Sequence, residues 1–390
     1  MAADQLAWLD RELRQWQGEG LVDAAAAQAI RRRYVASRRF SLARLLFVLG
    51  AGFLGVGLLW LVAANLDQLS PLTRFLMAVF AWLGAVAAAE FFAGRAQDDE
   101  RSPGTGAARI LAALLFGAVV FQAAQSLQVP AYASGLLGTW GVGALLYAYA
   151  VGGIGPLLVG IVTTAGWYAW TVGERTDDAA GAALSFVIAG AACTAVAVAH
   201  AARWRRPFAA PWRQVGALFV LLGLFLAALP DVAPGRLDVP APLWAGAVVI
   251  ALAAAGAVAL ADRSGRLEVA VAVASVVVGF ALLAWSPRQS FGDPTLSGAA
   301  LAYAVVAVVV YLAVAVWFAA LGVIRDTPRL TAVATAALVV FVTVQSFAVF
   351  APIFSGAALF LALGAFFLIS GLLADRGRRT LVANVREATS

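Results

Sequence analysis

Polar side chains inside long apolar stretches are the residues of this chain that could do chemistry. Three such stretches contribute amide or carboxylate groups near one of their ends: Asn65, Asp67, Gln122, Gln125 and Gln345. Gln122, Gln125 and Ser126 are spaced at i, i+3 and i+4, so a helix would place them on one face. Polar groups at such positions usually face water or the protein interior. They could line a pocket for a small solute or a lipid headgroup, or they could form hydrogen bonds between helices. The sequence leaves both readings open.

Glu90 is the acidic residue that the sequence places clearly within an apolar stretch, near its cytoplasmic end, beside Arg95 and within reach of Arg109. A proton-coupled carrier usually needs a carboxylate nearer the middle of the membrane. We therefore expect an interfacial ion pair between Glu90 and Arg109. His200, just before Arg203, could sense pH; the alternative is a residue at the membrane interface.

The residues needed for most catalytic and metal sites are missing. The chain has one cysteine and one histidine, which argues against Cys-based and multi-His metal sites. Zinc-protease, phosphate-loop and nucleophile-elbow motifs are also absent from the sequence. We therefore expect no catalytic, cofactor or metal site, and no enzyme.

The composition indicates that most of the chain lies in lipid and not in water. Of 390 residues, 63% are hydrophobic and 12% charged, against roughly 45–50% and 25% in soluble proteins. Twelve apolar stretches are each long enough to cross ~30 Å of hydrocarbon as a helix. They are 44–64, 72–93, 108–128, 132–151, 153–172, 180–201, 213–230, 241–261, 267–285, 297–322, 330–350 and 352–374. The predicted fold is an all-α polytopic membrane protein with about twelve transmembrane helices.

The arginines predict the topology. All 27 basic residues are Arg, and with the N-terminus inside, four fall outside: Arg74, Arg175, Arg236 and Arg288. Such a bias marks the cytoplasmic side, so we expect both termini in the cytoplasm. The use of Arg without Lys, beside much Ala and Val, indicates a GC-rich bacterial genome. The bilayer is then the expected partner, and nucleic acid is not. The glycine-rich turn at 151–156 leaves open whether 132–151 and 153–172 form a re-entrant pair.

Residues 1–40 form a separate segment with two predicted amphipathic helices. Leu6, Leu9, Leu13 and Trp16 recur at helical spacing, and Asp23 is suited to cap a second helix. We expect a cytosolic helical hairpin here, a transmembrane bundle over 41–375 and a cytosolic basic tail over 376–390. The hairpin could dock on anionic headgroups or bind a cytosolic protein.

Three segments together resemble a bacterial membrane-protein family, domain of unknown function 2157. The first is Leu13-Arg14-Gln15-Trp16 followed by Glu19-Gly20-Leu21-Val22-Asp23 and the helix end Ile30-Arg31-Arg32-Arg33-Tyr34; the second is Ala63-Ala64-Asn65-Leu66-Asp67; the third is Gln125 followed by Trp140. Val22 replaces the usual Ile and Leu66 the usual Trp. The resemblance covers about residues 5–170. It implies a multi-span inner-membrane protein with a cytosolic N-terminal hairpin, and it implies no activity.

These observations favour an integral inner-membrane protein whose molecular function is unknown, and they leave two alternative functions open. The first is a small-solute or lipid-related carrier with an outward-facing polar pocket. The second is a membrane scaffold or sensor whose hairpin, residues 1–40, binds a cytosolic partner.

Overall fold

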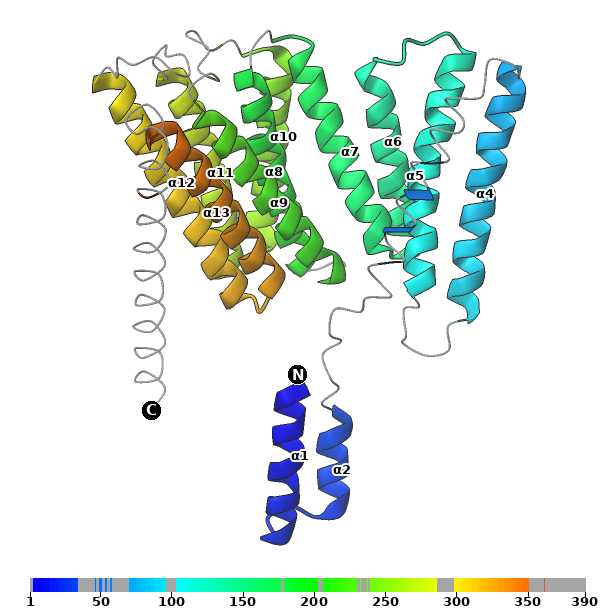
Figure 1. Ribbon diagram of the computed structural model, residues 1–390, viewed down its shortest axis with the longest axis vertical. Helices are drawn as coiled ribbons and strands as arrows, with labels where there is room; N and C mark the ends of the chain where they lie inside the picture. The colour runs from blue at the N-terminus through cyan, green and yellow to red at the C-terminus, as the bar shows by residue number, and fades with distance from the viewer. Residues whose placement is uncertain are drawn as a thin grey trace. The chain divides into compact units, whose positions relative to one another are not determined.

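The computed structural model describes residues 3–33, 70–95, 103–176, 179–202, 206–229, 239–285 and 298–350, with a few isolated positions outside them. The regular structure of these ranges is helical (Figure 1), which confirms the predicted all-α class for them. The chain divides into two compact units, Met1–Ser126 and Leu127–Ser390. This division falls inside the predicted bundle of residues 41–375. The predicted boundaries at residues 40 and 375 lie outside the described residues.

The first unit begins with two short helices, α1 (Ala3–Gly18) and α2 (Ala24–Arg33), which pack as a hairpin (Figure 1). Leu9, Leu13 and Ala27 form its buried centre. As predicted, Asp23 caps α2, its Oδ1 accepting the backbone N–H of Ala26 at 2.6 Å. A cytosolic place for this hairpin stays a prediction.

The remaining helices of the first unit are α4 (Pro71–Arg95) and α5 (Pro103–Ser126). Each starts with proline, whose fixed φ suits the first helical position. The two pack together with the rings of Trp82 and Phe116 5.5 Å apart. They coincide with the predicted spans 72–93 and 108–128.

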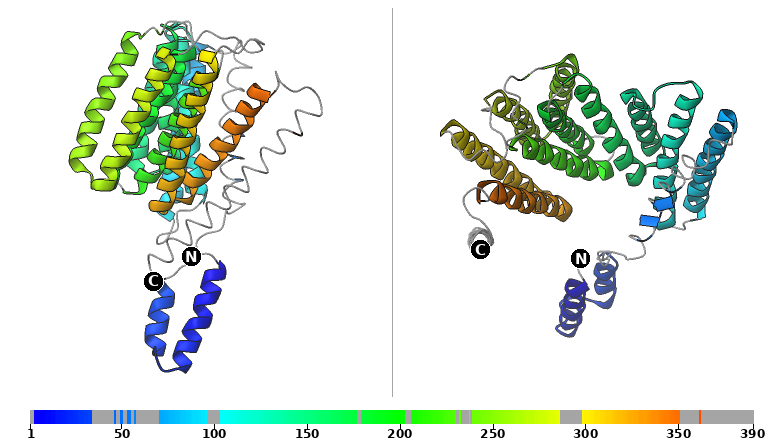
Figure 2. Two further views of the ribbon diagram at one scale, coloured as in Figure 1. Left: turned by 90° about the vertical axis from the view of Figure 1, so that its left-hand side faces the viewer. Right: turned by 45° about the horizontal axis from the view of Figure 1, so that its top comes forward.

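The second unit contains eight described helices, which run alongside one another (Figures 1 and 2). They are α6 (Ser134–Val151), α7 (Ile154–Gly173), α8 (Ala179–Ala202), α9 (Arg206–Ala227), α10 (Ala241–Leu260), α11 (Arg263–Trp285), α12 (Gly298–Ile324) and α13 (Pro328–Phe350). Each coincides with a predicted span. The predicted spans 44–64 and 352–374 lie outside the described residues, so the count of twelve stays a prediction.

Nine helices of the described chain are long and apolar enough to cross a membrane. Of the described helices from α4 to α13, α7 is not in that set, although it is 20 residues long and uncharged. Its Gly, Thr, Trp and Tyr residues lower its mean hydropathy. Membrane-spanning character is therefore supported for nine of the ten predicted spans that the structure describes.

A tight turn joins α6 and α7. Gly152 adopts a left-handed φ of 67°, and the N–H of Gly153 donates to the carbonyl oxygen of Ala148 at 3.1 Å. The helices have 18 and 20 residues, so each is about 27–30 Å long. That length favours a complete hairpin over a short re-entrant pair.

Helix α8 is the central helix of the second unit and packs against α7, α9, α10 and α11. Glycines bring α8 and α9 together: a Cβ built on Gly190 would lie 2.6 Å from the carbonyl oxygen of Gly216 and from the backbone nitrogen of Val220. Small residues of this kind let helix backbones approach closely in membranes. The tight contact fixes the orientation of α9, which positions Arg213 in the site described next.

Candidate functional site

The most unusual side chain in the described part of the second unit is Glu268 of α11. It lies within the apolar helix, and its side chain is 0% exposed. An ionised carboxylate cannot be buried without compensating charges, because its desolvation costs several kcal/mol. The partners of Glu268 therefore define the site.

Two arginines supply those charges. The Nε of Arg213, on α9, donates to Glu268 Oε2 at 2.7 Å, and the side chain of Arg213 is 6% exposed. The Nε of Arg325, just after α12, donates to Glu268 Oε1 at 2.7 Å, and this side chain is 25% exposed. Each carboxylate oxygen thus receives a charge-assisted hydrogen bond from a different arginine.

The cluster extends to the start of α11. Arg325 Nη2 donates to Ser264 Oγ at 2.7 Å and lies 3.9 Å from Asp262 Oδ1. Asp262 caps α11, its Oδ1 accepting the N–H of Gly265 at 2.7 Å. We call Arg213, Asp262, Ser264, Glu268 and Arg325 the Glu268 cluster. Its two arginines and two carboxylates cancel in formal charge.

Helix ends favour these charges. Asp262 precedes the N-terminus of α11, where the helix dipole stabilises anions, and Arg325 follows the C-terminus of α12, where it stabilises cations. The Gly265 N–H, helped by the Ser264 hydroxyl and Arg325, lowers the pKa of Asp262 below its ordinary value of 3.8. Asp262 is 69% exposed, so its carboxylate remains in contact with solvent.

A pH dependence follows from this shift. Because the pKa of Asp262 is lowered in the folded state, ionised Asp262 stabilises the fold above its ordinary pKa, and this contribution is lost as pH falls through the lowered value. We expect the thermal midpoint of the wild type to exceed that of Asp262→Asn above about pH 5. The difference should shrink steadily below about pH 4. A difference that grew on acidification would contradict the capping role.

An aromatic cluster with a histidine lies beside the first residues of α9. His200 of α8 is buried, and its Nδ1 lies 2.8 Å from the carbonyl oxygen of Val196. A carbonyl only accepts, so Nδ1 carries the proton in this contact. The hydroxyl of Tyr149 lies 2.9 Å from His200 Nε2 and accepts a hydrogen bond from Trp212 Nε1 at 3.2 Å. The bonds join α6, α8 and α9.

The predicted polar pocket is not assembled by any described contact. Asn65 and Asp67 lie outside the described residues. Gln122 is buried and Gln125 exposed, both in the first unit. Gln345, in the second unit, donates to the carbonyl oxygen of Ala228 at 3.3 Å. That bond is of the interhelical kind, which was the alternative to a pocket, and the shared pocket stays a prediction.

Glu90 and Arg109, paired in the sequence analysis, form an ion pair between α4 and α5. Arg109 Nη2 lies 3.1 Å from both carboxylate oxygens of Glu90, and Nε lies 3.2 Å from Oε1. Its position at a membrane interface stays a prediction.

Sequence reasoning missed the Glu268 cluster. It treated Glu90 as the acidic residue clearly inside a span, yet Glu268 lies six residues into α11 and is buried. The predicted topology contained a signal, because it puts the span ends that carry Arg213, Glu268 and Arg325 on the same side of the membrane. The predicted topology does not give the rotation of each helix about its own axis, and this rotation decides whether the three side chains meet.

No group of three or more His, Cys, Asp or Glu side chains that could hold a metal ion occurs within the described ranges. The apolar helices and their buried charges define a helical membrane protein. The model of the family described as "Predicted membrane protein (DUF2157)" matches residues 14–157. This confirms the resemblance inferred from the N-terminal segments. Neither the curated proteins nor the solved structures gave a match. The Glu268 cluster lies beyond the matched segment.

Proposed function

We propose that the protein is a carrier of a small solute or lipid in which the Glu268 cluster closes the second unit at its cytoplasmic end. The observation that carries this proposal is the buried carboxylate of Glu268, which holds the ends of α9, α11 and α12 together through Arg213 and Arg325. Ionisable groups buried within spans are expensive, so they mark functional positions.

The buried ion pair of Glu268 is suited to act as a gate, a contact that closes the helix ends and can open. A buried ion pair is a poor source of stability, because desolvation offsets its attraction, whereas apolar side chains would hold the helices equally well. The ion pair instead controls separation of the helices. Their ends cannot move apart until Arg213 and Arg325 separate from Glu268. The released arginines and carboxylate would then be hydrated by water entering from the cytoplasm.

Neutral hydrogen bonds occur among the described residues at the opposite end of α9. The hydroxyl of Tyr303 donates to the carbonyl oxygen of Ala227, and Gln345 donates to that of Ala228. Neutral hydrogen bonds contribute less than charge-assisted ones. Among the described residues, charged contacts close one end of the bundle and neutral bonds close the other, and such a bundle is suited to open outward.

Thiol labelling tests this alternation, since the chain has a single cysteine, Cys193, which can be replaced by serine. Ala217, one turn beyond Arg213, and Ala228, at the other end of α9, are both buried, and cysteine is a small replacement for alanine. Each is replaced by cysteine and labelled with a membrane-impermeant methanethiosulfonate in vesicles of both orientations. Glu268→Gln should increase labelling at 217 and decrease it at 228. Increases at both positions, or no change, would contradict a carrier.

Flux is measured in proteoliposomes of the same variants. One arm follows dithionite quenching of a fluorescent phosphatidylglycerol; the other follows light scattering after osmotic steps with glycerol, glucose or glycine. We expect wild-type flux above that of empty vesicles in one arm, and a changed rate in Glu268→Gln. Flux equal to that of empty vesicles in every arm would count against the proposal.

The alternative is a scaffold or sensor, and the self-contained packing of Leu9, Leu13 and Ala27 in the α1–α2 hairpin favours it. Deleting residues 1–40 separates the two functions. A carrier keeps its flux and its reciprocal labelling after the deletion. A scaffold instead loses a partner that the full-length chain recovers in a pull-down.

A further inference from the structure

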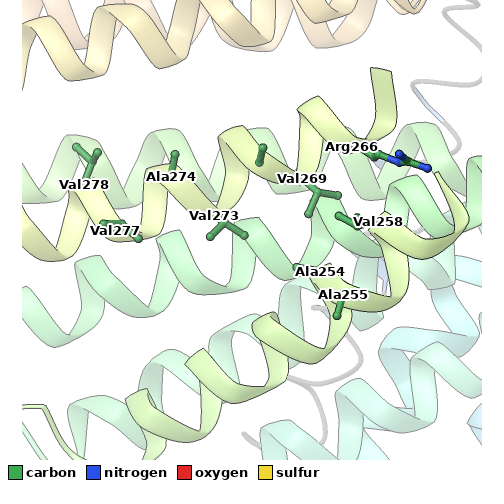
Figure 3. Close-up of a pocket in the computed structure, with 10 residues that line it drawn as sticks. Ala254, Ala255, Val258, Arg266, Val269, Val273, Ala274, Val277 and Val278 are labelled. Atoms are coloured by element: carbon green, nitrogen blue, oxygen red, sulfur yellow. The ribbon is translucent and has the colours of Figure 1, made fainter. Parts of the chain in front are cut away.

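An apolar groove of about 650 Å³ runs along the surface between α10 and α11. Its walls are short side chains, among them Ala254 and Val258 of α10 and Val269, Val273 and Ala274 of α11 (Figure 3). Alanine and valine at these positions leave a smooth channel, whereas leucine or phenylalanine would fill it. A channel of this kind on a membrane-spanning surface is suited to a hydrocarbon chain.

One end of the groove is cationic. Arg266 lies at that end, and Val277 and Val278 lie at the other (Figure 3). Arg263 precedes Arg266 by three residues, so both side chains project from the same side of α11, and both are exposed. Within the described ranges, no carboxylate lies within ion-pair distance of Arg266; its Nε donates to the carbonyl oxygen of Ala261 at 3.2 Å.

The length of the groove matches one leaflet. From Arg266 to Val277 the helix rises about 16 Å at ~1.5 Å per residue, and half of a ~30 Å hydrocarbon core is about 15 Å. The cationic end therefore lies at headgroup depth when the apolar end reaches the middle of the bilayer. Basic sites of this kind beside membrane helices recognise acidic lipid headgroups.

We propose that this groove binds one acyl chain of an acidic glycerophospholipid, whose phosphate pairs with Arg266 and Arg263. The lipid belongs to the leaflet on the Arg266 side, which the arginine distribution assigns to the cytoplasm. Charge complementarity selects an anionic headgroup. The Ala and Val walls accept an acyl chain but do not distinguish one acyl chain from another. The site does not depend on a transport activity, and Arg266 shares α11 with Glu268.

Headgroup selection is tested by native mass spectrometry of the full-length protein in detergent with phosphatidylglycerol or phosphatidylcholine of identical chains. Wild type should retain phosphatidylglycerol preferentially. Arg266→Gln should weaken its retention about fivefold, and Arg263→Gln with Arg266→Gln about 25-fold. Arg329→Gln is the matched control, because Arg329 is an exposed arginine on α13 that does not line the groove. Equal retention of the two lipids, or an equal effect of the control, would overturn the proposal.

Occupancy of the groove is tested separately. Ala274→Trp fills the channel at an exposed position and should reduce retention of both lipids at least fivefold. Val249→Trp, on an exposed part of α10 away from the groove, should not. Phosphatidylglycerol with a diazirine at the chain end should label the peptide around Val277 in wild type and lose that label in Ala274→Trp. Labelling elsewhere, unchanged by Ala274→Trp, would show that the lipid binds at another surface.

Discussion

Replacing Glu268 by glutamine should destabilise the second unit by about 3–5 kcal/mol, because the change leaves Arg213 buried without a counter-charge. In detergent, we expect the midpoint of thermal unfolding, followed by tryptophan fluorescence, to fall by roughly 10 °C. Arg325 is partly exposed and keeps Asp262 nearby, so most of the cost arises at Arg213.

A control variant and a double variant test whether the loss of stability arises from the pair of Arg213 and Glu268. Glu174→Gln removes an exposed carboxylate that, among the described residues, accepts from the backbone N–H and hydroxyl of Ser134, and should change the midpoint little. Combining Glu268→Leu with Arg213→Met should recover most of the lost stability, because a well-packed apolar pair avoids desolvation. If the effects of the two single changes simply added in the double variant, Arg213 and Glu268 would not be coupled as described.

Replacing Gly190 by alanine should give the second large effect, a loss of about 2–3 kcal/mol. Its new Cβ would lie 2.6 Å from two backbone atoms of α9, at Gly216 and Val220. Backbone atoms cannot rotate away, so α8 and α9 must separate and lose the packing around their contact. The midpoint of thermal unfolding again measures the loss.

Gly256→Ala is the matched control, because a Cβ on Gly256 of α10 meets nothing within 4 Å. This change should be neutral or stabilising by up to about 1 kcal/mol, as alanine is the better helix former. Gly190→Ala together with Gly216→Ala should cost less than the sum of the single changes, because one separation of the helices accommodates both methyl groups. Equal effects of Gly190→Ala and Gly256→Ala would refute close packing at Gly190.

The two large effects are connected through α9. Gly216 and Arg213 lie within one turn of each other, so the contact that sets α9 against α8 also positions the guanidinium that meets Glu268. We therefore expect Gly190→Ala to weaken the Glu268 cluster as well as the helix contact. The proposed gate thus depends on helix packing as well as on charge.

The sequence by itself determined the class of the protein and the place of its helices. Stretches of apolar residues are a local property, and the predicted spans from 72–93 to 330–350 coincide with α4 to α13. The Asp23 cap and the partnership of Glu90 with Arg109, which lie 19 residues apart on consecutive helices, were also within reach of local reasoning.

Only the tertiary structure decided which charges meet. Glu268 is 55 residues from Arg213 and 57 from Arg325, and an apolar helix such as α11 carries no polar face that would predict its rotation. Contact between the three side chains depends on that rotation, which the close approach of α8 and α9 and the packing of α11 against them establish. The length of an apolar stretch is a local property of the sequence, whereas contact between buried charges depends on how the helices pack.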